Sequence, residues 1–535
     1  MLQRFDRPIP MSALRLCSHF LLLAAISSFA QMATAQSQAK ALTLLRQSLE
    51  KMSAKPPASE PRCVECVGYE DTYPHYTRPR QTLRYTLKTI ITLDSEHEFM
   101  RCCDTLTLNK RVLTDTEFIG ANGYIESDRG DTTLVRGRTE KVAREHLRGI
   151  LYFPYAFLNA LMKCSEALAY AGRESIRGAL SDVVTGTIDS GTVGLDMPAP
   201  IVVYLDASTH LLAAVRRPFY NGMFGDDTER WEFRNYRDTL GVNCPRTVSY
   251  FVTGHVSEES TYSLISDERQ KDVVPAPVKW VLQTPDPKAE TKAIEENAKN
   301  APLPETVVEQ LAPHLFGVKL PEATDMALFA ECKDYVIAMD APLDRRHATA
   351  VLKAIREKVP TKPIRYLVLG HHHPDYTGGL SIFTEQGATI VTTPGNVDYF
   401  TSLAQAKHTR SARFPSQGTP HPTFLTETDS LSLGDDQFQM KVYNIGKKIH
   451  HTDEYQVYYF PASKLLVEGD LSGMRVGDTT AKANSYEIGL YESIVERKLD
   501  VDTIRQTYYP GEPKYSFNFP MAMLQRKVER AKAGK

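Results

Sequence analysis

A close-set group of metal-ligand side chains lies in the C-terminal half of this 535-residue chain. His371 and His373 are separated by one residue, Asp375 follows two residues later, and the pair Gly378-Gly379 comes next. Neutral imidazole and carboxylate are the ligand types that zinc and similar divalent ions accept. A polar loop that is rich in histidine by chance is the alternative, but the following glycine pair makes a chance match much rarer. The spacing therefore predicts a metal-binding turn.

The residues around this turn predict the elements that must position it. Residues 364–369 form a continuous apolar run, which is typical of a strand that is buried on both faces. Residues 334–340 predict an earlier strand that ends at Asp340, and a helix with an apolar face from Ala348 to Ile355 lies between the two. Strands that alternate with helices in this way indicate an α/β organisation.

These residues resemble the metallo-β-lactamase superfamily, whose loop reads His-x-His-x-Asp-His before Gly-Gly and follows a buried strand. Downstream, His450-His451-Thr452-Asp453 and the run from Lys464 to Asp470 are similar to the family's sequence of His-Thr, strand, turn, strand and Gly-Asp. Tyr509-Pro510-Gly511-Glu512 stands where the family has Pro-Gly-His. The resemblance covers roughly residues 306–520 and implies an α/β fold of the αββα sandwich type.

The resemblance also implies a first metal site. His371, His373 and His451 match the family's three histidine ligands, which implies a bound zinc ion. Zinc with an open coordination position lowers the pKa of bound water to about 7. Asp375 would accept the proton and Tyr376 would donate a hydrogen bond to the developing oxyanion. The expected reaction is hydrolysis of an ester, lactone, thioester, amide or phosphodiester in a small-molecule substrate that the sequence does not identify.

The family's second metal site is altered in this chain. Asp375 and Asp470 match two of its ligands, but Tyr376 replaces the loop histidine and Glu512 replaces the C-terminal histidine. The oxygen-rich set Asp375, Asp470 and Glu512 favours a harder ion such as manganese or iron, or no ion at all. Aspartate at position 470 is the residue that the glyoxalase II, lactonase and nuclease branches of the family have there. The β-lactam-cleaving enzymes usually have cysteine or serine at this position, so the resemblance does not favour β-lactam hydrolysis.

The altered ligands leave other functions open. One is a non-catalytic envelope binding protein, with a lipid or protein partner, on a degenerate metallo-β-lactamase fold. Another is a metal-dependent oxidoreductase, as in the diiron branch of the fold, although the sequence shows no flavin partner motif. Nucleic acid is not an expected partner, because 63 Lys and Arg against 65 Asp and Glu give a net charge of −2 without a basic block.

The chain is too long for one ordinary core and predicts several segments. Residues 1–35 read as a signal peptide, with basic residues, an apolar run and a small-x-small cleavage site, so we expect a periplasmic or secreted protein. An uncleaved N-terminal anchor is the alternative, and no transmembrane span is expected in the mature chain. Residues 36–275 predict a β-rich domain, residues 276–305 a proline-rich linker, and residues 306–535 the metallo-β-lactamase-like domain.

The N-terminal domain shows alternating apolar residues that predict antiparallel strands with one or two helices. Residues 37–55 predict an amphipathic helix, and a second helix is expected near residues 154–171. The pattern is similar to the half-barrel of periplasmic lipoprotein carriers, which implies an acyl lipid as a partner. A structural or docking role is the alternative.

Overall fold

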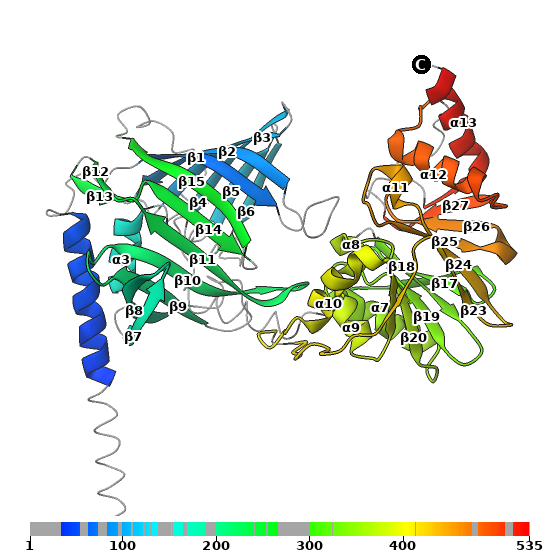
Figure 1. The fold of residues 1–535 in the computed structure, drawn as a ribbon, viewed down its shortest axis with the longest axis horizontal. Helices are drawn as coiled ribbons and strands as arrows, with labels where there is room; N and C mark the ends of the chain where they lie inside the picture. Colours follow the sequence, from blue (N-terminus) through cyan, green and yellow to red (C-terminus); the bar gives the residue numbers. More distant parts are fainter. Residues whose placement is uncertain are drawn as a thin grey trace, which may run out of the picture.

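Figure 1 shows the computed structural model, in which an N-terminal part and a C-terminal part lie beside each other. No helix in the described ranges is long and apolar enough to cross a membrane. The predicted signal peptide up to residue 33, and residues 276–299 and 301 of the predicted linker, lie outside the described residues. The structure describes residues 34–53, 63–72, 83–94, 99–108, 111–120, 123–128, 131–136, 151, 153–163, 168–188, 199–239, 241–252, 255–265, 300, 302–323, 325–411, 413–472, 480–508 and 517–533.

The N-terminal part is built on one antiparallel sheet of thirteen strands in the order β6-β5-β4-β3-β2-β1-β15-β14-β11-β10-β9-β8-β7. A separate two-stranded sheet pairs β12 (Arg237–Thr239) with β13 (Val242–Cys244). The strands of the large sheet are β1 (Cys63–Thr72), β2 (Leu83–Asp94), β3 (Phe99–Leu108), β4 (Arg111–Gly120), β5 (Gly123–Asp128), β6 (Asp131–Arg136), β7 (Ala169–Ile176), β8 (Ala179–Ile188), β9 (Ala199–Asp206), β10 (Leu212–Asn221), β11 (Gly225–Arg234), β14 (Thr247–Val252) and β15 (His255–Ile265).

Two helices cover part of this sheet. The helix over residues 34–52 and α3 (Pro154–Lys163) share one apolar core with strands β8 to β11 and β14, in which Leu45, Leu158 and Trp231 are buried. The helix predicted over 154–171 extends too far, because residues 169–171 belong to β7, which pairs with β8. Strand pairing there overrides the local helical pattern.

The C-terminal part contains two mixed sheets, of seven and six strands, each in sequence order. The pairs β19–β20, β20–β21, β21–β22 and β26–β27 are parallel, and the other pairs are antiparallel. The strands are β16 (Val307–Ala312), β17 (Leu315–Leu320), β18 (Asp325–Glu331), β19 (Val336–Met339), β20 (Ile364–Val368), β21 (Thr389–Thr392) and β22 (Phe424–Thr426) in the first sheet, and β23 (Ser430–Gly434), β24 (Gln439–Asn444), β25 (Gln456–Phe460), β26 (Leu465–Glu468), β27 (Thr503–Gln506) and β28 (Asn518–Pro520) in the second.

Helices cover the outer faces of both sheets. The first sheet packs on α7 (Arg345–Lys358), α9 (Leu380–Thr384) and α10 (Val397–Gln405), and the second packs on α11 (Gly446–Ile449), α12 (Ser485–Glu496) and α13 (Met521–Ala533). The short elements α8 (Pro374–Thr377), η2 (Pro394–Asn396) and η3 (Pro461–Ser463) lie in the connections.

A separate core joins the two sheets face to face. In β18, Ala327 and Phe329 pack toward the helices, while Leu328 and Ala330 pack toward the second sheet. A strand that is buried on both faces needs apolar residues at every position, which explains the continuous apolar runs in the sequence. The predicted α/β class is confirmed, with an antiparallel N-terminal sheet and an αββα arrangement in the C-terminal part.

The parallel strands β19 and β20 bring two loops to the same edge of the first sheet. Asp340 follows β19 in the left-handed region, with φ 63°. Its Oδ1 atom accepts hydrogen bonds from Gly370 N (2.9 Å) and from the Tyr458 hydroxyl (2.8 Å). Asp340 therefore anchors the start of the loop at residues 370–379, which we call the metal loop.

Candidate metal centre

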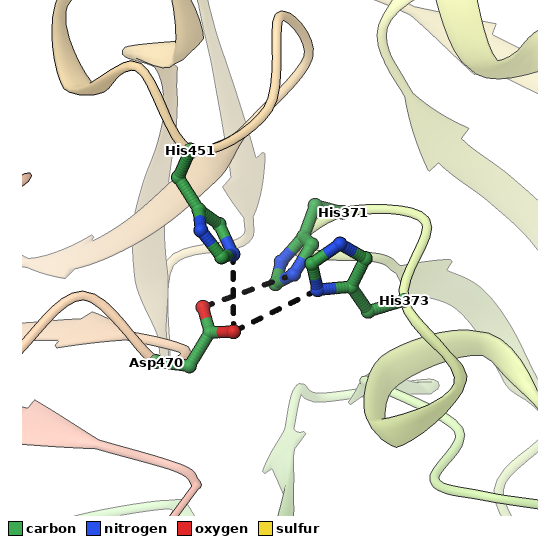
Figure 2. A group of neighbouring side chains, drawn as sticks. All are labelled: His371, His373, His451 and Asp470. Atoms are coloured by element: carbon green, nitrogen blue, oxygen red, sulfur yellow. Dashed lines mark ion pairs between the residues drawn. The ribbon is translucent and has the colours of Figure 1, made fainter. Parts of the chain in front are cut away.

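Four side chains from three loops converge at the edge between the two sheets (Figure 2). His371 and His373 come from the metal loop after β20, His451 from the loop before β25, and Asp470 from the end of β26. One nitrogen or oxygen atom of each lies within 4.8 Å of the others. We call these four residues the metal-ligand group, because imidazole nitrogens and a carboxylate at this spacing could hold a metal ion.

Asp470 lies at the centre of the group. Its Oδ2 atom is 3.1 Å from His451 Nε2 and 3.7 Å from His373 Nδ1, and its Oδ1 atom is 3.8 Å from His371 Nε2. Burial opposes the charge of Asp470, but the three histidines hold the pKa of its carboxyl well below its usual value. Asp470 is therefore ionised, as a ligand must be.

The chemistry of His371 fits a metal. Burial, reinforced by the neighbouring His373 and His451, holds the pKa of His371 well below its usual value, although Asp470 acts in the opposite direction. The ring is fully buried, and neither nitrogen has a hydrogen-bond partner among the described residues. Buried polar atoms without a partner are unfavourable, and a bound cation would satisfy one of these nitrogens.

Asp375 and Tyr376 lie next to the group but are not part of it. Both belong to α8, and Asp375 is half-buried, outside the set of atoms that lie within 4.8 Å of one another. Tyr376 is 1% exposed, and its ring centroid is 4.3 Å from that of His371. Burial, with Asp470 nearby, raises the pKa of Tyr376 well above its usual value, so it keeps its hydroxyl proton. Glu512 lies outside the described residues.

Glycines allow the metal loop to lie close to the turn before α7. A Cβ atom at Gly378 would lie 1.8 Å from Leu343 O, and one at Gly379 would lie 2.2 Å from Ala348 Cβ. Real side chains cannot approach so closely, so only glycine fits at either position. The Gly-Gly pair next to the histidines is thus explained by packing.

Tyr455 is a supporting residue that sequence reasoning missed. Its hydroxyl accepts hydrogen bonds from Gly469 N (2.8 Å) and Asp470 N (3.1 Å) and donates to Asp470 Oδ1 (3.3 Å). The ring also stacks on His371, with centroids 4.6 Å apart. Tyr455 therefore orients both a carboxylate and an imidazole of the group. A tyrosine directly before a buried strand gives no signal of such a role in the sequence.

Asp325 is a second residue near the site that the sequence did not identify. It begins β18, is 2% exposed, and its Oδ2 atom has no hydrogen-bond partner among the described residues. Burial first, then the charges of Asp375, Asp340 and Asp470, raise the pKa of Asp325 to about 8. The site edge thus contains a carboxyl that is mostly protonated at neutral pH. The one signal in the sequence is a lone acidic residue at the start of an apolar strand.

Comparison with solved structures shows that part of the chain is similar to metallo-β-lactamases. A metallo-beta-lactamase from Pontibacter korlensis is 19% identical, with 43% of this chain and 99% of that chain covered and a TM-score of 0.31. The DIM-1 metallo-beta-lactamase is 16% identical, with 44% of this chain and 100% of that chain covered and a TM-score of 0.32. A structure of DIM-1 exposed to ceftazidime is 17% identical, with the same shares covered and a TM-score of 0.30. No family model and no curated protein matches the chain.

Proposed function

We propose that the chain is an exported metal-dependent hydrolase and that its metal-ligand group binds zinc. The convergence of three buried imidazoles and one carboxylate from three separate loops carries this proposal. In catalytic zinc sites three histidines can hold the ion and leave its fourth position to water. His371, His373 and His451 would be these ligands, and Asp470 would hydrogen-bond that water or take part in a second site. A zinc ion held there would lower the pKa of water to about 7 and supply hydroxide at neutral pH. The proposed substrate is a small molecule with an ester, lactone, thioester, amide or phosphodiester bond.

Two neighbouring residues would assist this reaction. Burial raises the pKa of Asp375 above its usual value, which brings the carboxylate closer to the basicity that a general base needs at neutral pH. Tyr376 keeps its hydroxyl proton and has no hydrogen-bond partner for it among the described residues. Its hydroxyl is therefore available to donate to an oxyanion that forms during attack on the substrate.

A second ion is the less supported part of the proposal. It would be a harder ion, such as manganese or iron, and would use Asp375, Asp470 and Glu512. Asp375 lies outside the 4.8 Å group, so an ion held by Asp375 and Asp470 would occupy a site distinct from the one among the three histidines. The three-histidine zinc site does not depend on this second ion.

Elemental analysis of the mature chain, residues 36–535, purified without chelator from the periplasm, tests the proposal. We expect about one zinc per chain, with hydrolysis of an ester, lactone or phosphodiester that is lost in His373→Ala. Failure to bind zinc or manganese even after soaking would overturn the proposal and favour a non-catalytic envelope binding protein. Zinc without hydrolysis across the screen would reject the enzyme but keep the metal site.

The same preparation tests export and the N-terminal partner. Export predicts that the mature protein begins at Gln36, which N-terminal sequencing detects directly. An acyl lipid that co-purifies with the chain and is identified by mass spectrometry would support the predicted lipid-binding role of the N-terminal sheet. Repeated absence of lipid would leave a structural or docking role.

A further inference from the structure

The hairpin between β10 and β11 in the N-terminal part docks on a loop of the C-terminal part. We call residues 406–411 and 413–418 the interface loop. Asp226 N donates to Lys407 O (2.6 Å), and the Asp226 carboxylate accepts hydrogen bonds from Thr409 N (3.0 Å) and Arg410 N (2.9 Å). A Cβ atom at Gly225 would lie 2.2 Å from Lys407 O. The hairpin therefore fits the interface loop at the distance of backbone contact.

The tip of the hairpin enters the core of the C-terminal part. Met223 is 6% exposed and belongs to the apolar cluster between the first sheet and helices α7, α9 and α10. Phe224 packs against the same cluster. Asn221 Oδ1 accepts hydrogen bonds from Met223 N (2.8 Å) and Phe224 N (3.0 Å), which fixes the shape of the tip. The N-terminal part thus completes a core that otherwise belongs to the C-terminal part.

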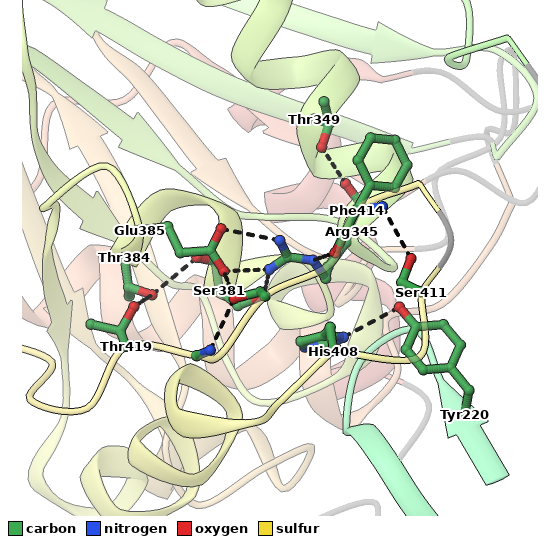
Figure 3. Close-up of polar contacts among 12 residues, drawn as sticks. Tyr220, Arg345, Thr349, Ser381, Thr384, Glu385, His408, Ser411, Phe414 and Thr419 are labelled. Atoms are coloured by element: carbon green, nitrogen blue, oxygen red, sulfur yellow. Dashed lines mark hydrogen bonds and ion pairs between the residues drawn. The ribbon is translucent and has the colours of Figure 1, made fainter. Parts of the chain in front are cut away.

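A polar contact fixes the other side of the hairpin (Figure 3). The Tyr220 hydroxyl lies 3.3 Å from Nδ1 of His408, which is fully buried. Arg345 of α7 ties the interface loop to the helices, because it donates to Phe414 O (3.2 Å) and to Ser381 Oγ of α9 (2.8 Å). The interface loop is therefore held between the hairpin on one side and α7 and α9 on the other.

The docked hairpin touches the residues that support the metal loop. A Cβ atom at Gly222 would lie 3.0 Å from Asp344 Cβ, and Asp344 caps the N-terminus of α7. Asp344 O lies 2.7 Å from the Cβ position of Gly379 in the metal loop. The turn at Asp344 is thus in contact with the hairpin on one side and with the metal loop on the other.

A second route passes through aromatic rings. The Phe224 ring lies 6.5 Å from that of Tyr399, and the Tyr399 ring lies 6.1 Å from that of His372. His372 stands between the ligands His371 and His373, and all three are buried. A closely packed interior transmits displacements, so a shift of the hairpin would displace the side chains of His371 and His373.

We infer that the β10–β11 hairpin is a positioning element of the metal centre. By its docking, the N-terminal part holds the metal loop in its ligand geometry, and metal affinity is a property of the whole chain. The part of this inference that concerns metal affinity rests on the proposed function, in which the metal-ligand group binds zinc. The alternative is an interface that joins the two parts without any effect on the ligands, and the experiment below separates the two.

Two glycine substitutions in the full chain form a matched pair. Gly225→Ala places a Cβ against Lys407 O at a backbone φ of +77°. Gly178→Ala has a similar φ of +83°, but no atom lies within 4 Å of its Cβ position. Both variants place alanine at a similar positive φ, and only Gly225→Ala pushes the hairpin away from the interface loop. Asp226→Asn is a milder variant that weakens the docking without any steric clash.

The primary readouts are the zinc dissociation constant, by chelator competition, and the absorption spectrum of bound Co²⁺. We expect Gly225→Ala to weaken zinc binding by about tenfold and to shift the cobalt bands, as couplings of this kind are worth about 5- to 150-fold. Asp226→Asn should show a smaller change in the same direction, and Gly178→Ala should match the wild type. Equal affinities and spectra in Gly225→Ala and Gly178→Ala would overturn the inference.

Hydrogen exchange of the metal-free chain gives a readout that does not need a metal. We expect faster exchange in Gly225→Ala at both the interface loop and the metal loop, with no change in Gly178→Ala. If the wild type binds no zinc or cobalt, the proposed function fails, and the exchange result alone decides the inference. Unchanged exchange at the metal loop in Gly225→Ala would overturn the inference. The double variant Gly225→Ala with Asp226→Ala should expose the interface loop, and an interface loop that stays protected in it would also overturn the inference.

Discussion

Replacing Tyr455 with phenylalanine removes one oxygen atom from the support of the metal-ligand group. That oxygen accepts hydrogen bonds from Gly469 N and Asp470 N and donates to the Asp470 carboxylate. The first amide is buried and the second is partly buried, so both lose their partner without free access to water. An unsatisfied buried donor costs about 1–3 kcal/mol, so the two amides predict a loss of about 2–6 kcal/mol in the free energy of unfolding. We expect the lower half of this range, because Asp470 N is only partly buried.

The same substitution should weaken metal binding. Loss of a residue that orients a ligand typically lowers metal affinity by about 10- to 100-fold. Urea unfolding of the metal-free chain measures the first effect, and zinc titration against a chromophoric chelator measures the second. The two measurements are independent, because the stability loss comes from the backbone amides and the affinity loss comes from the carboxylate.

Tyr486→Phe is the matched control. The Tyr486 ring also contacts a member of the metal-ligand group, with its centroid 5.2 Å from that of His451, but it lies on α12 and is only half-buried. Tyr486→Phe, like Tyr455→Phe, removes one tyrosine hydroxyl oxygen beside the metal-ligand group. If Tyr455→Phe and Tyr486→Phe give equal unfolding free energies and equal zinc affinities, the Tyr455 hydroxyl does not orient Asp470 and the reasoning is wrong.

Three further predictions concern the ligands and the acidic edge of the site. His373→Ala should lower zinc affinity at least about tenfold, whereas alanine at the exposed neighbour His450 should leave it unchanged, as measured by chelator competition. Burial raises the pKa of Asp325 to about 8, above its unfolded value of 3.8, so its contribution to stability is complete below pH 3.8 and is lost as the pH rises toward 8. Asp325→Asn should therefore reduce the pH dependence of metal-free unfolding between pH 4 and 8, and an unchanged profile would contradict the burial argument. Tyr376→His combined with Glu512→His should raise the second-ion content in elemental analysis, and a content that stays at one ion or none would show that more than ligand identity limits that position.

The sequence predicts the C-terminal elements well because their patterns are local. The apolar run at residues 364–369 becomes β20, and the spacing of Ala348 and Ile355 becomes the buried face of α7. His371 and His373 are close in sequence, so a single turn brings them together. Their assembly with His451 and Asp470 was inferred from the family resemblance, since no local pattern joins residues about eighty to one hundred positions apart.

The supporting residues could not be predicted because their roles depend on packing between distant segments. Tyr455 acts on Asp470 only because β25 and β26 are neighbours in the second sheet. Asp325 lies near the site because β18 runs antiparallel to β19, which places its first residue at the edge where Asp340 ends the neighbouring strand. Tyrosine is an ordinary residue directly before a buried strand, and the lone acidic residue at position 325 indicates an unusual environment without showing which groups it contacts.

The glycine pair of the metal loop shows why the two parts of the chain should not be treated separately. Gly378 and Gly379 identify the loop in the sequence, and in the structure they fit against the turn at Leu343 and Asp344. Leu343 has a φ of 61°, which is unfavourable for a leucine, and a conformation of this kind persists only where its surroundings enforce it. Those surroundings include Gly222 of the β10–β11 hairpin, which packs on Asp344. A C-terminal fragment without the hairpin would keep all four residues of the metal-ligand group but would lose a contact on the turn that supports the metal loop. We therefore expect such a fragment to bind zinc more weakly than the full chain, even where its secondary structure is intact.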